Sequence, residues 1–129
     1  MKRVVLIDDD RDDAEVFQEA LEEVGNHFVF QYFENGESAL AEWSKEEKLL
    51  PDIIFLDLNL PQISGWEILQ HVRQTHDLAS IPVVMYTTSS LKSELEMSLD
   101  QGANFFITKP TNYNELKRLL AEVLGKVLM

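Results

Sequence analysis

Short apolar runs alternate with segments of helical periodicity along the whole chain, and this alternation restricts the folds that it can adopt. Residues 4–7 and 53–56 are entirely apolar, as is typical of strands covered on both faces. Between such runs, apolar residues recur at spacings of three and four, which indicates one face of a helix. Strands that alternate with helices form a parallel sheet with helices on both sides. The sequence therefore predicts a single α/β fold of five strand–helix units.

The expected elements can be placed by residue number. Strands are expected at residues 4–7, 28–33, 52–57, 82–87 and 105–107. Helices are expected over about residues 14–24, 38–43, 64–72, 90–101 and 112–127. Asp10 and Ser64 are suited to cap the first and third of these helices. The helix expected over 90–101 has the weakest apolar periodicity. Its leucines at positions 91, 95 and 99 lie on one face.

Composition excludes several classes of function. The 129 residues carry 11 basic and 23 acidic side chains, a formal charge of −12, which disfavours binding to nucleic acids and to anionic membranes. The absence of cysteine excludes disulfides, thiol catalysis and cysteine-bound zinc. No apolar run approaches the ~20 residues of a membrane span, and no signal peptide is evident. We therefore expect a cytoplasmic protein with one domain over residues 1–129 and no output domain.

Polar side chains follow four of the five expected strands. In open parallel sheets, ligands bind beyond the carboxyl ends of the strands, where the strand order reverses. The side chains that this rule brings to one rim are Asp8, Asp9, Asp10, Asp57, Thr87, Thr88, Thr108 and Lys109. The sequence therefore predicts a cluster of carboxylates, hydroxyls and one amine at a single edge of the sheet.

This cluster indicates a phosphoryl-group chemistry. Two carboxylates a few ångströms apart repel each other by roughly 4 kcal/mol at an effective dielectric of 20, so protons, Lys109 or a cation must offset the repulsion. Oxygen ligands without His or Cys favour a hard cation, and Mg²⁺ suits an open rim. A metal, a lysine and a hydroxyl together can neutralise and orient a phosphoryl group. One carboxylate could then act as nucleophile and form an acyl phosphate.

The acidic segment after the first strand also has simpler interpretations. Carboxylates favour a helix N-terminus, and Asp10 fits the cap of the first helix, although capping needs only one acid. Four acids from Asp8 to Glu19 match positions one, three, five and twelve of a calcium loop, but Asp13 stands where that loop requires glycine. The acids of residues 10–23 are otherwise interpreted as the solvated face of the first helix.

The rim residues carry a resemblance to a known family. Asp8-Asp9, Asp57-x-Asn59-x-Pro61, Thr87 and Lys109-Pro110 stand in the order and spacing of the receiver domain of bacterial two-component response regulators. The resemblance covers residues 2–127. It implies a flavodoxin-like fold with strand order 2-1-3-4-5. It also implies a phosphorylation-dependent switch rather than a turnover enzyme, with only Mg²⁺-dependent autophosphorylation and slow self-hydrolysis.

The resemblance implies a role for each residue of the site. Asp57 would be the phosphoacceptor. Mg²⁺ would be held by Asp8, Asp9, Asp57 and the backbone carbonyl of Asn59. Lys109 would pair with one phosphoryl oxygen.

The resemblance also implies a switch. Thr87 would hydrogen-bond a phosphoryl oxygen and draw in the loop after the fourth strand. Phe106 would be the aromatic residue that packs inward on activation, although a plain core role is the alternative. The peptide bond between Lys109 and Pro110 would be cis.

Three positions bear on the lifetime of the acyl phosphate, and one of them departs from the family pattern. Thr88 stands where the family usually has Ala or Gly, and its bulk could restrict the access of water to an acyl phosphate. We therefore expect slow hydrolysis. Asn59 and Ser89 occupy the two other positions that tune this lifetime in the family, and the sign of their net effect stays open.

The resemblance implies partners as well. The phosphoryl donor would be a sensor histidine kinase or a histidine phosphotransfer protein. An unknown downstream protein would bind through the face of the fourth helix, fifth strand and fifth helix, and a homodimer is left open. The loop at 57–61 and the run at 87–89 resemble receivers that partner phytochrome-type kinases.

Two alternative functions are weighed against a receiver. An aspartyl phosphatase of the haloacid-dehalogenase type would use Asp8-x-Asp10, but Asp12 stands where that motif has a hydroxyl. A binding module that never becomes phosphorylated is the third possibility, and the conjunction of Asp57, Thr87 and Lys109 counts against it.

Overall fold

Five parallel strands form the sheet. The computed structural model describes residues 1–128. The strands are β1 (Lys2–Ile7), β2 (Phe28–Phe33), β3 (Ile53–Leu56), β4 (Val83–Thr87) and β5 (Phe105–Thr108). Their order is β2-β1-β3-β4-β5, and each neighbouring pair is parallel. The predicted α/β fold and its strand order are confirmed.

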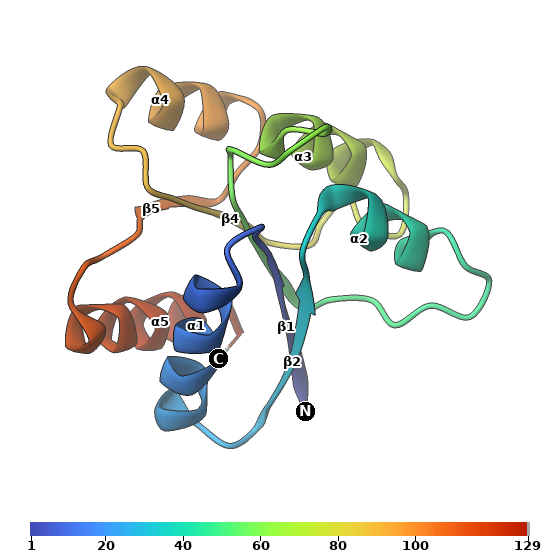
Figure 1. Cartoon of the computed structure of the whole chain (residues 1–129). Coiled ribbons are helices and arrows are strands. Elements are labelled where there is room, and N and C mark those ends of the chain that lie inside the picture. The colour runs from blue at the N-terminus through green and yellow to red at the C-terminus, as the bar shows by residue number, and fades with distance from the viewer. Residues whose placement is uncertain (129) are drawn as a thin grey trace.

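Helices cover both faces of this sheet. They are α1 (Arg11–Val24), α2 (Gly36–Trp43), α3 (Gly65–Gln74), α4 (Lys92–Asp100) and α5 (Tyr113–Leu128). Figure 1 shows α1 and α5 on one side of the sheet and α2, α3 and α4 on the other. Residues 1–128 contain no helix that combines the length and the apolar character needed to cross a membrane.

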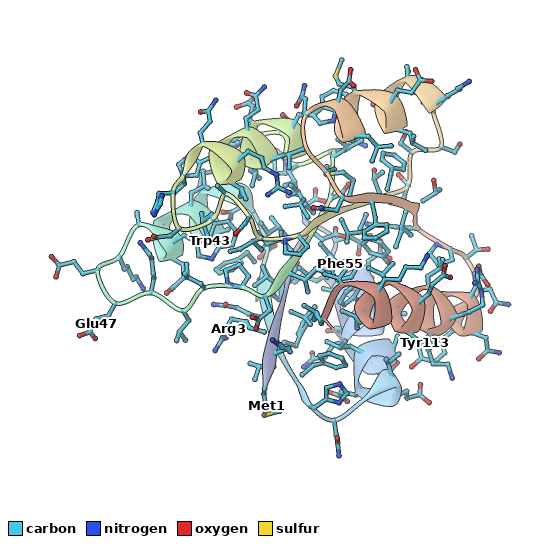
Figure 2. All side chains as sticks on the ribbon, turned by 180° about the vertical axis from the view of Figure 1, so that it is seen from behind. Met1, Arg3, Trp43, Glu47, Phe55 and Tyr113 are labelled. Atoms are coloured by element: carbon cyan, nitrogen blue, oxygen red, sulfur yellow. The ribbon has the colours of Figure 1, made fainter. Side chains whose placement is uncertain are left out.

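The alternation of side chains along the central strands divides the core into two layers. Phe55 faces α1 and α5, where its ring lies 5.0 Å from that of Phe17, and Tyr86 lies 5.5 Å from Phe17. Ile54 packs with the opposite layer, against residues of α2 and α3 such as Ile68. Figure 2 shows Phe55 within the molecule, beside α5. Because both faces of β3 are buried, its sequence is uniformly apolar.

Side-chain caps explain where four of the helices begin. In each case the cap accepts a hydrogen bond from the backbone N–H three residues later, and the caps are Asp10, Asn35, Ser64 and Asn112. The predicted caps at Asp10 and Ser64 are confirmed. The second helix begins at Gly36, two residues earlier than expected, because Asn35 starts a helix rather than only a turn.

Helix α4 is the least anchored of the five. Its N-cap position, Leu91, makes no side-chain capping bond, and the only buried residue of the helix is Ser98. The side chains of Leu91 and Leu99 are 61% and 45% exposed. Two of the three leucines that the sequence places on one face of this segment are therefore exposed, in keeping with its weak helical pattern. The polar groups of Ser98 are satisfied by Glu94 and Trp66, and this pairing turns the Ser98 face towards the protein.

Candidate functional site

The carboxyl ends of β1, β3 and β5 bring oppositely charged side chains together. Lys109 Nζ lies 2.7 Å from Asp8 Oδ2 and 3.6 Å from Asp57 Oδ2. Carboxylate oxygens of Asp8, Asp9 and Asp57 lie within 4.8 Å of one another. Asp8 and Asp57 are buried, whereas Asp9 is exposed. The structure thus brings together Asp8, Asp9, Asp57 and Lys109, which were predicted to meet at one edge of a parallel sheet.

Asp8 is held at the end of β1 by its own backbone and by β2. Its N–H donates to the carbonyl of Phe33 at 3.1 Å, and its carbonyl accepts a 2.7 Å hydrogen bond from the Tyr32 hydroxyl. One carboxylate oxygen accepts from the N–H of Asp10 at 2.9 Å. Burial raises the pKa of Asp8 to about 6, although the hydrogen bond with Lys109 acts to lower it. A cation here would relieve the cost of the buried charge.

Asp57 follows β3 and is fixed by close backbone contacts. Its N–H donates to the carbonyl of Ile7 at 3.0 Å, and its Oδ1 accepts from the N–H of Asn59 at 3.2 Å. The start of α3 passes directly against this turn, since the N–H of Gly65 donates to the carbonyl of Leu58 at 3.0 Å. A Cβ on Gly65 would lie 2.2 Å from the carbonyl oxygen of Asp57. Gly65 therefore sets how closely α3 approaches the site.

Lys109 is shared among three carboxylates. Its N–H donates to the carbonyl of Thr87 at 2.7 Å, which fixes its backbone beside β4. Its ammonium group also lies 2.9 Å from Asp13 Oδ2 on α1, and only 9% of its side chain is exposed. Burial acts to lower the pKa of Lys109, but the hydrogen bonds with Asp8 and Asp13 and the charge of Asp57 outweigh it. The pKa therefore lies above its usual value, and the lysine stays charged.

The three clustered carboxylates fit a hard divalent cation. Their oxygens are close enough to share one ion, and their donor set contains no nitrogen or sulfur. Asp9 opens the group to solvent, so a cation would have an entry path and room for water. The three carboxylates predicted to bind the ion are thus compatible with a divalent cation in position and in chemistry.

A family comparison covers most of the chain. Residues 4–121 match the family of the response regulator receiver domain. This chain belongs to that family. It is therefore a receiver of the kind found in two-component signal transduction, where such domains act as signalling switches rather than as classical enzymes.

Individual relatives of this receiver extend over nearly its whole length. Response regulator Rcp1 of Synechocystis sp. is 31% identical over 92% of this chain and 84% of its own. The probable methanogenesis regulatory protein FilR2 of Methanothrix harundinacea is 29% identical over 93% of this chain and 79% of its own.

Two solved structures show the same architecture. The Mn²⁺-bound form of Rcp1 has a TM-score of 0.86 at 29% identity and covers 97% of this chain and 93% of its own. The phosphorylated cyanobacterial phytochrome response regulator RcpA has a TM-score of 0.85 at 30% identity, over 98% of this chain and 94% of its own.

The loop after β4 lies beside the charged group of the receiver. Thr87 is buried, and its hydroxyl accepts a long hydrogen bond of 3.4 Å from the N–H of Ser89. The carbonyl of Ser89 accepts from the Thr108 hydroxyl at 2.8 Å, while its own hydroxyl pairs with Glu94. Thr88 is exposed. The loop is therefore tied both to β5 and to the first turn of α4.

Phe106 and Asn59 occupy intermediate positions. Phe106 is half-buried and packs against the core layer on the α2 and α3 side of the sheet. The side chain of Asn59 is exposed, while its backbone N–H is bonded to Asp57. The roles predicted for these two residues stay predictions.

The predicted cis bond between Lys109 and Pro110 is wrong. Every peptide bond within residues 1–128 is trans. A trans bond before proline is intrinsically favoured by about 0.5–1 kcal/mol. In this structure the trans chain also carries Lys109 from β5 to its hydrogen bond with Thr87 and to its ion pairs with the acids.

Sequence reasoning missed two residues of the site. Asp13 was assigned to the solvated face of α1, yet it contacts Lys109. A usable signal was its spacing, because Asp13 precedes Phe17 by four residues and so continues the buried stripe of the helix by one turn. Gly65 carried no prediction, and no local pattern indicates its close approach to Asp57.

Proposed function

We propose that this receiver is a phosphoacceptor switch that takes a phosphoryl group onto Asp57 from a histidine kinase or a histidine phosphotransfer protein. The observation that carries the proposal is the placement of Asp57 within 3.6 Å of the Lys109 ammonium and beside Asp8 and Asp9. A carboxylate nucleophile needs such positive charge nearby, because the incoming phosphoryl group is itself negative.

The proposed reaction transfers the group from nitrogen to oxygen. A carboxylate oxygen of Asp57 attacks phosphorus, so that an O–P bond forms and the P–N bond of phosphohistidine breaks. The electron pair of the broken bond stays on the imidazole nitrogen, and the other ring nitrogen carries a proton, so neutral imidazole leaves. The product is an acyl phosphate, which water later hydrolyses to restore the carboxylate.

Each neighbouring residue has a task in this proposal. Asp8, Asp9, Asp57 and the backbone carbonyl of Asn59 would hold Mg²⁺. When bound, this ion neutralises the acids and orients phosphoryl oxygens. Lys109 pairs with a further phosphoryl oxygen through a charge-assisted hydrogen bond.

The switch would act through α4, β5 and α5. Thr87 donates its hydroxyl to a phosphoryl oxygen and draws in the loop that Ser89 ties to β5 and α4. Phe106, which is half-buried, then packs further inward. A shift from 1:99 to 99:1 between two arrangements needs about 5.5 kcal/mol of differential contact, which two charge-assisted bonds and an aromatic side chain can supply. A downstream protein would bind the altered face.

The partner of this receiver is proposed to be a phytochrome-type kinase. RcpA, at 30% identity over 98% of this chain, is described as a phytochrome response regulator. The resemblance of the loop at 57–61 and of the Thr87–Ser89 run to such receivers agrees with this assignment.

A phosphatase built on Asp8 and Asp10 has less support. Asp10 uses a carboxylate oxygen to cap α1, at 3.1 Å from the N–H of Asp13. Its side chain is exposed and committed to the helix rather than to the acid cluster. We therefore expect no multiple turnover on small phosphate esters.

Incubation with phosphoramidate and Mg²⁺, followed by intact-mass measurement, tests the proposal. The parent chain should gain the mass of one phosphoryl group, and Asp57→Asn should gain none. A matched control is Asp52→Asn, since Asp52 lies at the opposite end of β3 and accepts a hydrogen bond from the N–H of Arg3. Equal labelling of the parent and Asp57→Asn would contradict the proposal.

A further inference from the structure

Lys109 makes its two shortest ion pairs with carboxylates other than the proposed phosphoacceptor. The distances from Nζ are 2.7 Å to Asp8, 2.9 Å to Asp13 and 3.6 Å to Asp57. Asp13 is 96 residues from Lys109 in the sequence. It belongs to α1, so the contact joins this helix to the residue that follows β5. The ammonium group thus forms ion pairs with three acids, and its contact with Asp13 is also a hydrogen bond.

Neither helix capping nor the metal cluster accounts for this position of Asp13. The cap of α1 is Asp10, and Asp13 contributes only its backbone N–H to that cap. The group of carboxylates that could share a cation comprises Asp8, Asp9 and Asp57, without Asp13. The acid is 41% exposed at its side chain and faces Lys109 because the buried face of α1 holds it there.

We propose that Asp13 is a positioning residue that competes with the phosphoryl group for Lys109 and thereby limits how strongly phosphorylation is favoured. This inference rests on the proposed phosphorylation of Asp57. For Lys109 to bind a phosphoryl oxygen, its ammonium group must approach Asp57 and weaken at least one of its shorter contacts. Asp8 would have its charge neutralised by a bound cation, so Asp13 is the acid that continues to hold the lysine away from Asp57.

Removal of the Asp13 charge should therefore favour the phosphorylated state. Asp13→Asn keeps the shape of the side chain and its backbone capping bond but removes the charge that holds Lys109. Because Asp13 is partly exposed, its attraction is screened, and we expect a gain of about three- to tenfold rather than more. The gain should appear in the affinity for beryllofluoride, a phosphoryl mimic, and in the rate of labelling by phosphoramidate.

A general loss of negative charge near the site would also favour an anion, so the experiment needs a matched control. Asp12 is the neighbouring acid on α1; it is exposed and makes no ion pair among residues 1–128. Asp12→Asn changes the net charge by the same amount without touching Lys109. Both variants are compared with the parent at saturating Mg²⁺, so that changes in metal affinity do not contribute.

The experiment measures beryllofluoride affinity in the parent, Asp13→Asn and Asp12→Asn, each with and without Lys109→Ala. Asp13→Asn should bind several-fold more tightly than the parent, Asp12→Asn should stay close to the parent, and the Asp13 effect should vanish in the Lys109→Ala background. A second readout needs neither metal nor phosphate: the NMR resonances of the Lys109 side chain should shift in Asp13→Asn and stay close to those of the parent in Asp12→Asn.

The outcomes separate this inference from the proposed function. If the parent binds beryllofluoride but Asp13→Asn matches Asp12→Asn, or binds more weakly than the parent, the competition is refuted while the phosphoacceptor assignment stands. Persistence of the Asp13 effect without Lys109 would likewise refute it. A parent chain that neither binds beryllofluoride nor becomes phosphorylated would overturn the proposed function, and this inference with it.

Discussion

Trp66 on α3 donates its indole N–H to the hydroxyl of Ser98 on α4, at 3.0 Å. Ser98 in turn donates to the carbonyl of Glu94 at 2.7 Å, and the Glu94 carboxylate pairs with Ser89 in the loop after β4. A continuous set of hydrogen bonds therefore joins this loop, the exposed helix α4 and a tryptophan ring. Movement of the loop or of α4 should change the surroundings of that ring.

Trp66 fluorescence should report activation. Trp43→Phe leaves Trp66 as the single tryptophan, and this change is tolerable because the buried indole N–H of Trp43 has no partner within residues 1–128. Addition of Mg²⁺ and beryllofluoride should shift the Trp66 emission, since α4 would move relative to α3. The shift should be smaller in a variant that also carries Ser98→Ala. An unchanged spectrum, with ligand binding verified by calorimetry, would contradict a switch through α4.

The buried carboxyl of Asp8 should give the metal-free chain a characteristic pH dependence. Its pKa is raised from the ordinary 3.8 to about 6 by burial. At a pH between these two pKa values, Asp8 is protonated in the folded chain and ionised in the unfolded chain. Its contribution to the free energy of unfolding therefore falls as the pH rises through this window. In the presence of EDTA, the stability of Asp8→Asn relative to the parent should therefore increase from pH 4 to about 6 and then level off.

Denaturant unfolding of both chains at several pH values measures this difference. The comparison with Asp8→Asn cancels the titration of the other acids, which the two chains share. A difference in unfolding free energy that does not change across the window would show that Asp8 is solvated in the folded state.

Gly65→Ala should destabilise the receiver by about 3 kcal/mol, because the added Cβ would meet the backbone of Asp57 and Leu58. Gly125→Ala is a matched control, since no atom lies within 4 Å of a Cβ added at that helical position. That variant should gain about 0.5–1 kcal/mol from helix propensity. Chemical denaturation distinguishes the two, and equal stability changes would rule out the close approach of α3.

Thr88→Ala should shorten the lifetime of the acyl phosphate several-fold, because a smaller side chain leaves more room for an attacking water. Thr88 is exposed in the loop next to the charged group, so the substitution should not alter the fold. Ser90→Ala, two positions further along this loop, serves as the control and should leave the lifetime unchanged. Loss of the phosphoryl group can be followed by intact mass, and a Thr88→Ala lifetime equal to that of the parent would end this hypothesis.

Much of this architecture could be predicted from short-range patterns. The uniformly apolar sequence of β3 indicates a strand that is buried on both faces. Asp57, directly after it, indicates that the functional site lies at the carboxyl ends of the strands. The parallel direction of the strands placed Lys109 at the same edge of the sheet as Asp8 and Asp57 without knowledge of any distance. These predictions succeeded because strand burial follows from periodicity and strand direction follows from the alternation of strands with helices.

The failures concern features that depend on tertiary contacts. The sequence did not indicate that Ser98 makes the inward contact of α4, because this contact depends on hydrogen bonds that periodicity does not encode. Asp13 looks like one more surface acid until the fold places α1 beside Lys109, the residue that follows β5. The trans bond before Pro110 reflects how β5 continues into its loop, which the Lys-Pro pair alone does not determine.

The most direct test of the proposed chemistry locates the phosphoryl group on the chain. After labelling with phosphoramidate and Mg²⁺, borohydride reduction converts a phosphorylated aspartate into homoserine, and peptide mass mapping identifies its position. We expect the reduced residue at Asp57 alone. Reduction at Asp8, Asp9 or Asp13 instead, or an unmodified Asp57 in a chain that has gained the label, would contradict the assignment of Asp57 as the phosphoacceptor.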